Sequence, residues 1–356
     1  MHFLNAGFEG THPLTDVDGS AFPAGSASAE WAGKPLCDGK VRVVIWAGTA
    51  DLEFMGNDLG FPHFGSNDPC WLCPASRRHD AMCKITECSK NASFKHQCYT
   101  TEGPGLEKPT HHPVMDIPGM TRFHWPGDLM HTGSLGVVLY FLGSVFYELV
   151  YDGVLDRRPD AALEKLWLLI KNLYGRLGIQ NRLSQLTLKM FVQSDAYPAL
   201  GAKAAEGQAL LPVVLEICKA YDDGSEHHAH RTRALQALTE FNNISKTASL
   251  VPSDEDAKAM VDAIDTHLLH SNWLLNRAIS KNVLLYPLFT KHHLLWHIAD
   301  QAKWLNPRAC WAFEFEDFLG DMVQSAKACL AGTPMDVLGN KVLENYTLLL
   351  ELTLQM

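Results

Sequence analysis

The sequence predicts an α+β protein that is predominantly helical, with one or two core strands near the front of the chain. Residues 40–48 (KVRVVIWAG) form a short, β-branched and nearly continuous apolar run, which is typical of a strand buried on both faces. From Asp128 onward, apolar residues recur at helical spacing between capping signals. A hydrophobic content of 47% and a charged content of 20% over 356 residues allow a large core and exclude a disordered chain.

The remaining elements follow from turn and helix signals along the chain. Residues 1–39, 54–69 and 70–126 are rich in Gly, Pro, Ser or Cys and are expected to be mostly irregular. Ser253 starts a Ser-x-x-Asp pattern, and Pro334 stands at a first helical position, so both mark helix starts. Helices are expected over about 128–149, 161–174, 185–191, 200–221, 231–241, 253–279, 291–304, 314–331 and 333–352.

Residues 134–150 (SLGVVLYFLGSVFYELV) are the one run that resembles a membrane span. The run has 17 residues, includes Glu148 and lacks basic flanks, whereas a span needs about 20 apolar residues. We therefore expect a buried helix and no membrane partner. Residues 1–15 lack a basic start and an apolar segment, so we expect a nuclear or cytoplasmic protein that is not secreted.

The formal net charge of -10 counts against autonomous binding to nucleic acid, because such proteins usually carry a basic excess. A basic groove on an acidic body is still compatible with this charge, since the field depends on local placement.

Cys70 and Cys73 form a Cys-x-x-Cys pair, and two thiolates at this spacing can bind one Zn²⁺ ion. The chain has an odd number of cysteines, 9, and five of them cluster in residues 70–98, which favours a metal over disulfides in a reducing compartment. His293 and His297 lie at i and i+4, so a helix would place both imidazoles on one face. The other candidate ligands are Cys83, Cys88, His96, Cys98 and His292.

Acidic residues provide a second set of candidates. Asp51 directly follows the predicted strand, where α/β sheets place reactive groups. Glu316 lies in an acidic, aromatic segment at a predicted helix start, and two carboxylates holding Mg²⁺ would suit phosphoryl transfer. Asp128 and His131 are spaced to interact on one helix; the alternative is a capping aspartate beside an unrelated histidine.

In this order, the motifs resemble the RNase H-like catalytic domain of DDE-type DNA transposases, in particular the CACTA group. The similarity lies in residues 43–73, 126–143 and 291–320. It implies a partial RNase H-like core sheet with a large all-α insertion. The implied domains are a partial core with a Cys-rich loop (1–127), a helical insertion (128–285) and C-terminal helices that complete the core (286–356).

The resemblance also implies roles for individual residues. Asp51 and Glu316 would be the second and third catalytic carboxylates and would bind Mg²⁺. Cys70, Cys73, His293 and His297 would form one structural zinc site, similar to that of the V(D)J recombinase catalytic subunit. Asp128 and His131 would be the signature of the insertion. DNA is the implied partner, and homo-oligomerisation is compatible with the family.

The chain departs from the family pattern at its start. The first catalytic aspartate should lie on an earlier strand, but only about 40 residues precede Val41, and Asp16 and Asp18 lie in a loop-like segment. We therefore expect an N-terminally truncated, inactive relative of the transposases. The alternative is a zinc-stabilised interaction module without catalysis. A zinc hydrolase is a third reading, but Leu294 stands where a general base would follow the first histidine.

Overall fold

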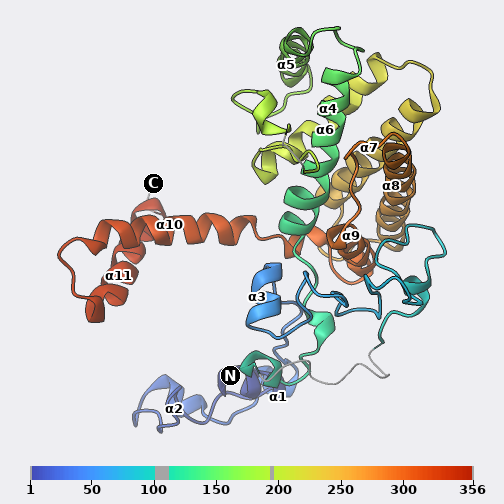
Figure 1. The fold of residues 1–356 in the computed structure, drawn as a ribbon. Coiled ribbons are helices and arrows are strands. Elements are labelled where there is room, and N and C mark those ends of the chain that lie inside the picture. Colours follow the sequence, from blue (N-terminus) through green and yellow to red (C-terminus); the bar gives the residue numbers. More distant parts are fainter. Residues whose placement is uncertain (1, 101–111, 193–195, 355–356) are drawn as a thin grey trace. The chain divides into compact units, whose positions relative to one another are not determined.

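The computed structural model describes residues 2–100, 112–192 and 196–354 (Figure 1). About 58% of the structure is helical. Among the described residues there is no β-strand, only three isolated bridges. The predicted α+β class with a partial RNase H-like sheet is therefore wrong, and the fold is helical.

The segment predicted as the buried strand has no regular secondary structure. Residues 41–50 form two backbone hydrogen bonds to other segments, from Val43 N to Gly7 O (2.8 Å) and from Gly48 N to His124 O (2.7 Å). Val44 and Trp46 are each 59% exposed. A β-branched run becomes a strand only when another strand pairs with it, and the described part of the chain provides none.

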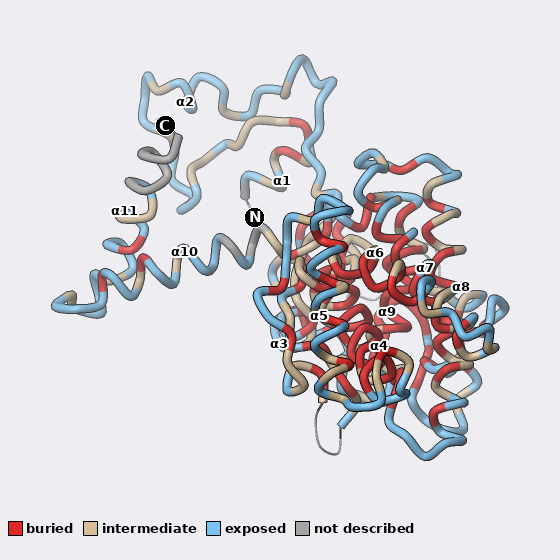
Figure 2. The backbone as a smooth tube through the Cα atoms, turned by 90° about the horizontal axis from the view of Figure 1, so that it is seen from above, coloured by how far each residue is buried: buried red, intermediate tan, exposed pale blue. Residues whose placement is uncertain are grey.

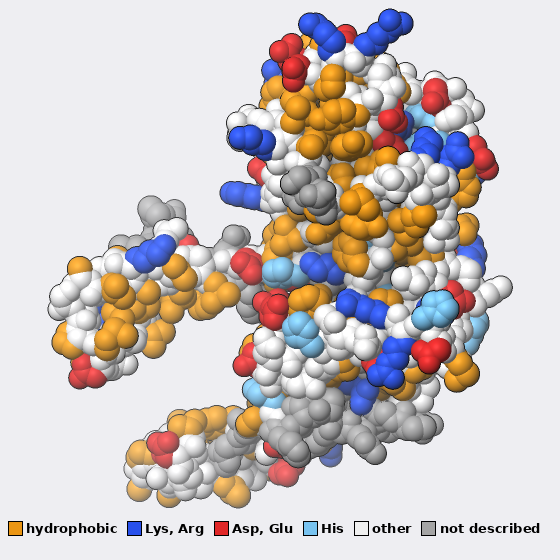
Figure 3. Space-filling view, viewed as in Figure 1, with side chains coloured by type: hydrophobic (Ala, Val, Ile, Leu, Met, Phe, Trp, Pro, Cys, Tyr) orange, Lys and Arg blue, Asp and Glu red, His pale blue; other side chains and the backbone are white. Residues whose placement is uncertain are grey.

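The chain divides into two compact units, residues 1–310 and 311–356. The first unit contains α1 (His2–Glu9), α2 (Ala27–Trp31), α3 (Leu52–Asn57), α4 (Leu139–Tyr151), α5 (Pro159–Arg176), α6 (Ala204–Ala220), α7 (Glu226–Thr247), α8 (Asp254–Ser280) and α9 (Thr290–Asp300). The second unit is a helical hairpin of α10 (Phe313–Leu330) and α11 (Met335–Leu354), and apolar side chains are exposed along it (Figure 3).

The core of the first unit is built around one continuous apolar helix. It begins as the π-helical segment η5 (Met130–Val138) and continues as α4. By length and composition Met130–Tyr151 could cross a membrane, but 83% of its apolar window is buried inside the protein, in agreement with the predicted buried helix. Gly143 allows a close approach, because a Cβ atom there would lie 2.7 Å from the carbonyl oxygen of Pro198.

Helices α5, α6 and α9 pack directly on this central helix, while α7 packs on α6 and α8 packs on α7 and α9; Figure 2 shows the buried residues concentrated in α4 to α9. The predicted helix at 253–279 is α8, and Ser253 caps it by accepting a hydrogen bond from Asp256 N (3.1 Å). Of the predicted helix at 185–191, only the short 3-10 turn Leu188–Met190 is present. Helix α9 contacts α8 and η5, which fixes the position of the two candidate histidine ligands.

Candidate metal centre

The Cys-x-x-Cys pair lies in a tight, buried loop. Trp71 Nε1 donates a hydrogen bond to Trp125 O (3.0 Å), and Tyr99 N donates to Leu72 O (2.9 Å), so the residues between the cysteines are held on both sides. Leu72 N also donates a hydrogen bond to Cys70 Sγ (3.4 Å). Backbone N–H groups directed at sulfur stabilise a thiolate, which is the form that binds metal.

His293 and His297 come from the same face of α9, as the i, i+4 spacing predicts. Phe94, from the Cys-rich segment, packs edge-on against His293 with ring centroids 4.4 Å apart, and it also contacts Trp296 at 5.2 Å. A nearly buried ion pair between Lys95 and Asp265 joins the same segment to α8. These contacts bring the Cys-rich segment and α9 together at one point.

The four candidate ligand atoms lie within 4.8 Å of one another, and all four residues are buried. Cys73 Sγ lies 3.6 Å from Cys70 Sγ, 3.3 Å from His293 Nε2 and 3.3 Å from His297 Nε2, and the two Nε2 atoms are 3.2 Å apart. Tetrahedral zinc with Zn–S of about 2.3 Å and Zn–N of about 2.05 Å would separate the ligands by about 3.8 Å (S–S), 3.5 Å (S–N) and 3.3 Å (N–N). The cluster therefore has nearly the dimensions of a tetrahedral metal site.

The pKa values of the four side chains indicate which of them carry the protons that a metal ion would displace. Burial raises the pKa of the Cys70 thiol, but Cys73 and the two imidazoles outweigh burial and hold this pKa well below its usual value. The hydrogen bond with Cys70 and burial raise the pKa of Cys73. Burial lowers the pKa of His297, yet the Cys70 thiolate raises it to about 10. Two thiols and two imidazoles can thus hold a divalent metal ion once these protons leave.

Two further features bear on metal binding. His293 Nδ1 is buried and has no hydrogen-bond partner among the described residues, whereas a histidine ligand usually donates through its second nitrogen. A cavity of about 710 Å³ has His297, Leu72 and Cys98 in its wall. This cavity therefore borders the cluster on its His297 side.

Of the other candidate ligands of the sequence, Cys98 lies beside the cluster and interacts with His297, and the rest have partners elsewhere or are exposed. Cys83 Sγ donates to Gln97 Oε1 (3.2 Å), Cys88 to Thr86 O (3.4 Å) and Cys98 to Phe94 O (3.4 Å), while His96 is exposed. His292 accepts a hydrogen bond at Nδ1 from Phe289 N (3.3 Å) and stacks on His267. The structure thus groups the distant pair, His293 and His297, with the Cys-x-x-Cys loop rather than Cys83 or Cys88.

The two predicted catalytic carboxylates are in different units. Asp51 is the N-cap of α3 and accepts a hydrogen bond from Phe54 N (2.7 Å). Glu316 lies in α10 with an exposed side chain, and the side chains of Glu314 and Asp317 are outside the described residues. Among the described residues, Asp51 belongs to no group that can hold a metal ion. Their joint binding of Mg²⁺ stays a prediction.

Asp128 and His131 form the contact that their spacing predicts. Asp128 is fully buried and accepts hydrogen bonds from Met130 N (2.9 Å) and His131 N (3.0 Å), and its carboxylate also contacts His131 Nδ1. The carboxylate therefore caps the first turn of η5, which is the capping role that the sequence allowed.

Sequence reasoning missed a buried polar network in the same bundle. Glu148 contacts His227 Nε2 (2.8 Å), Arg231 Nη1 (3.0 Å) and the Tyr286 hydroxyl. Burial raises the pKa of Glu148, but His227 and Arg231 outweigh burial and lower it. A glutamate inside an otherwise apolar helix was the available signal, because a buried charge requires a partner.

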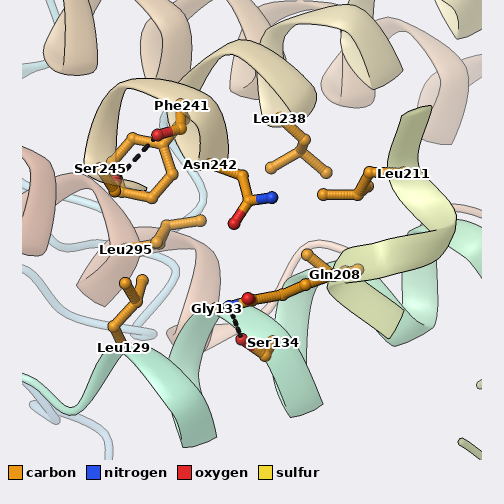
Figure 4. Close-up of a pocket in the computed structure, with 11 residues that line it drawn as sticks. Leu129, Gly133, Ser134, Gln208, Leu211, Leu238, Phe241, Asn242, Ser245 and Leu295 are labelled. Carbon is orange, nitrogen blue, oxygen red and sulfur yellow. Dashed lines mark hydrogen bonds between the residues drawn. The ribbon is translucent and has the colours of Figure 1, made fainter. Parts of the chain in front are cut away.

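A second metal-compatible group and a small cavity also came from the structure alone. Asp222, Asp223 and His228 are close together, but both aspartates are exposed and His228 already contacts Arg231 and Thr232. Figure 4 shows the carboxamide of Asn242 facing a cavity of about 20 Å³ opposite Gln208, which has room for about one water molecule. Neither feature offers four buried ligand atoms close together, as the Cys/His cluster does.

Comparisons with known proteins add no assignment: no family model, no curated protein and no solved structure matches the chain.

Proposed function

We propose that this chain is a zinc-stabilised helical interaction module. The observation that carries the proposal is the buried cluster of Cys70, Cys73, His293 and His297 with nearly tetrahedral dimensions. Soft thiolates with imidazoles favour zinc over magnesium or calcium. Four protein ligands leave no open coordination position, so the ion would be structural and would join the Cys-rich segment to α9.

A non-catalytic role also fits the helical fold and the charge of the protein. The chain carries a net charge of -10, and on the face drawn in Figure 3 basic side chains are interspersed with acidic ones. Such a surface supports binding to another protein better than binding to the phosphates of DNA.

Elemental analysis of the purified chain tests the zinc centre. We expect about one zinc per chain, lost in Cys73→Ser and in His297→Ala because each change removes one of four ligands. Cys83→Ser is the matched control, since Cys83 is buried nearby but contacts Gln97. Full zinc retention in His297→Ala, or loss of zinc in Cys83→Ser, would contradict the proposed ligand set.

A second candidate is a transposase-derived protein that has lost strand transfer. The pairing of the Cys-x-x-Cys loop with His293 and His297 supports it, because the resemblance to DDE-type transposases implies this pairing. A DNA nicking assay with Mg²⁺ or Mn²⁺ distinguishes a relic from an enzyme. We expect no cleavage by the intact chain; cleavage that disappears in Asp51→Ala would contradict the loss of activity.

A further inference from the structure

A second pair of histidines faces each other between α7 and α8. Their Nδ1 atoms, in His230 and His270, are 2.9 Å apart, and the two rings are inclined at 75°. Trp273 stacks nearly flat on His230, with ring centroids 4.1 Å apart and an interplanar angle of 11°. The indole thus fixes the orientation of one imidazole, and the pairing of α7 with α8 fixes the other.

Both rings are available as neutral ligands. Burial lowers the pKa of His230, and burial together with His230 and Arg233 lowers the pKa of His270. In the neutral pair one Nδ1 donates a hydrogen bond to the other. A change of one tautomer, which moves a proton from Nδ1 to Nε2, leaves one lone pair on each Nδ1 atom, so both atoms can be ligands of an ion that lies beside the line joining them.

The separation of the two nitrogens favours one class of metal ion. Two ligands at about 2.05 Å from a metal and at 90° to each other are about 2.9 Å apart, whereas tetrahedral zinc separates two nitrogens by about 3.3 Å. The 2.9 Å distance between His230 and His270 therefore matches the cis positions of a tetragonal or octahedral ion. Nickel(II) and copper(II) prefer such geometries and imidazole ligands.

We propose that His230 and His270 form a second metal site, separate from the Cys/His cluster, for a divalent ion of the nickel and copper class. Water completes the coordination. Glu226, one turn before His230, favours a cation, while Arg233 opposes it, so the two imidazoles carry the binding. The face of Trp273 also favours a positively charged imidazole–metal unit over the ring.

Titration of the zinc-loaded full chain with Ni²⁺ tests this site, because nickel is not reduced by the free cysteines. Equilibrium dialysis would count bound Ni²⁺ in the wild type, in His230→Gln and in His270→Gln. Loss of a residue that only hydrogen-bonds to a metal ligand already weakens metal binding by about 10–100-fold. Removal of either histidine ligand should therefore weaken the binding of one equivalent of Ni²⁺ at least tenfold. His79→Gln is the matched control, because His79 is an exposed histidine outside the pair.

The expected result is one equivalent of Ni²⁺ that both variants weaken, that His79→Gln leaves unchanged, and that binds while the zinc content stays constant. Unchanged nickel binding in both variants would overturn the proposal, since the pair would then only share a proton. Release of zinc in step with nickel uptake would also overturn it, because nickel would be entering the Cys/His cluster. His230 is only partly buried, so we expect His230→Gln to retain the fold.

Discussion

Substitution of Glu148 by Gln tests the buried network that joins α4, α7 and the segment leading into α9. The Glu148 and Arg231 side chains are each 5% exposed and 3.0 Å apart. Glutamine keeps the shape and the hydrogen-bonding atoms but removes the counter-charge of Arg231. Removal of one partner from a buried ion pair costs about 3–5 kcal/mol, because the remaining charge is left uncompensated away from water. We expect a loss of that order in the free energy of unfolding.

Urea unfolding of the purified protein, followed by circular dichroism, would measure this loss. Glu216→Gln is the matched control: its carboxylate pairs with Arg176 and Lys219 but is 38% exposed, so we expect a change of only about 0–1 kcal/mol. The double variant Glu148→Gln/Arg231→Met removes both charges and should be more stable than Glu148→Gln alone. A loss below about 1 kcal/mol in Glu148→Gln, or a double variant less stable than the single one, would refute this reasoning.

Three further changes have defined outcomes. Burial lowers the pKa of His267 to about 4, so as the pH falls this imidazole is protonated in the unfolded state before it is protonated in the folded state. The neutral His267 should therefore contribute about 3 kcal/mol to the free energy of unfolding above pH 6.5, and this contribution should be lost as the pH falls to 4. Denaturation at several pH values should show a smaller slope in His267→Gln, and an equal slope would contradict the assignment. Gly143→Ala places a Cβ atom 2.7 Å from a backbone oxygen and should cost about 1–3 kcal/mol by thermal unfolding, whereas Gly320→Ala, with no atom within 4 Å, should not destabilise. Asp51→Ala removes the cap of α3 and should cost about 1 kcal/mol without changing the zinc content, and a loss of zinc would contradict a purely capping role.

The helical part of the fold could be predicted because its signals are local. Ser253 and the apolar period after it define α8 almost to the residue, and the run around Glu148 is a buried helix as expected. The strand at residues 40–48 could not be judged locally, because its apolar residues specify a strand only when a pairing partner exists. Its sequence is compatible with a strand, but in the structure the segment is irregular.

The candidate site shows the same division. The i, i+4 spacing of His293 and His297 and the i, i+3 spacing of the cysteines are local and predict two half-sites. Only the resemblance paired these half-sites across more than 200 residues, and the structure brings them together. The contacts of Glu148 with Arg231 and of His230 with His270 depend on how helices pack, so the sequence by itself contains no signal for either pairing.

The distance along the chain between the two halves of the Cys/His cluster also sets an order of events during synthesis. Cys73 and His293 are 220 residues apart, and a ribosome adds about 5–20 residues per second, so the cysteines emerge roughly 10–45 s before their histidine partners. During that interval the thiols of the Cys-x-x-Cys loop have only local partners and are open to oxidation or to transient capture of metal. The contacts of the Cys-rich segment with α9 can therefore form only after α9 has emerged.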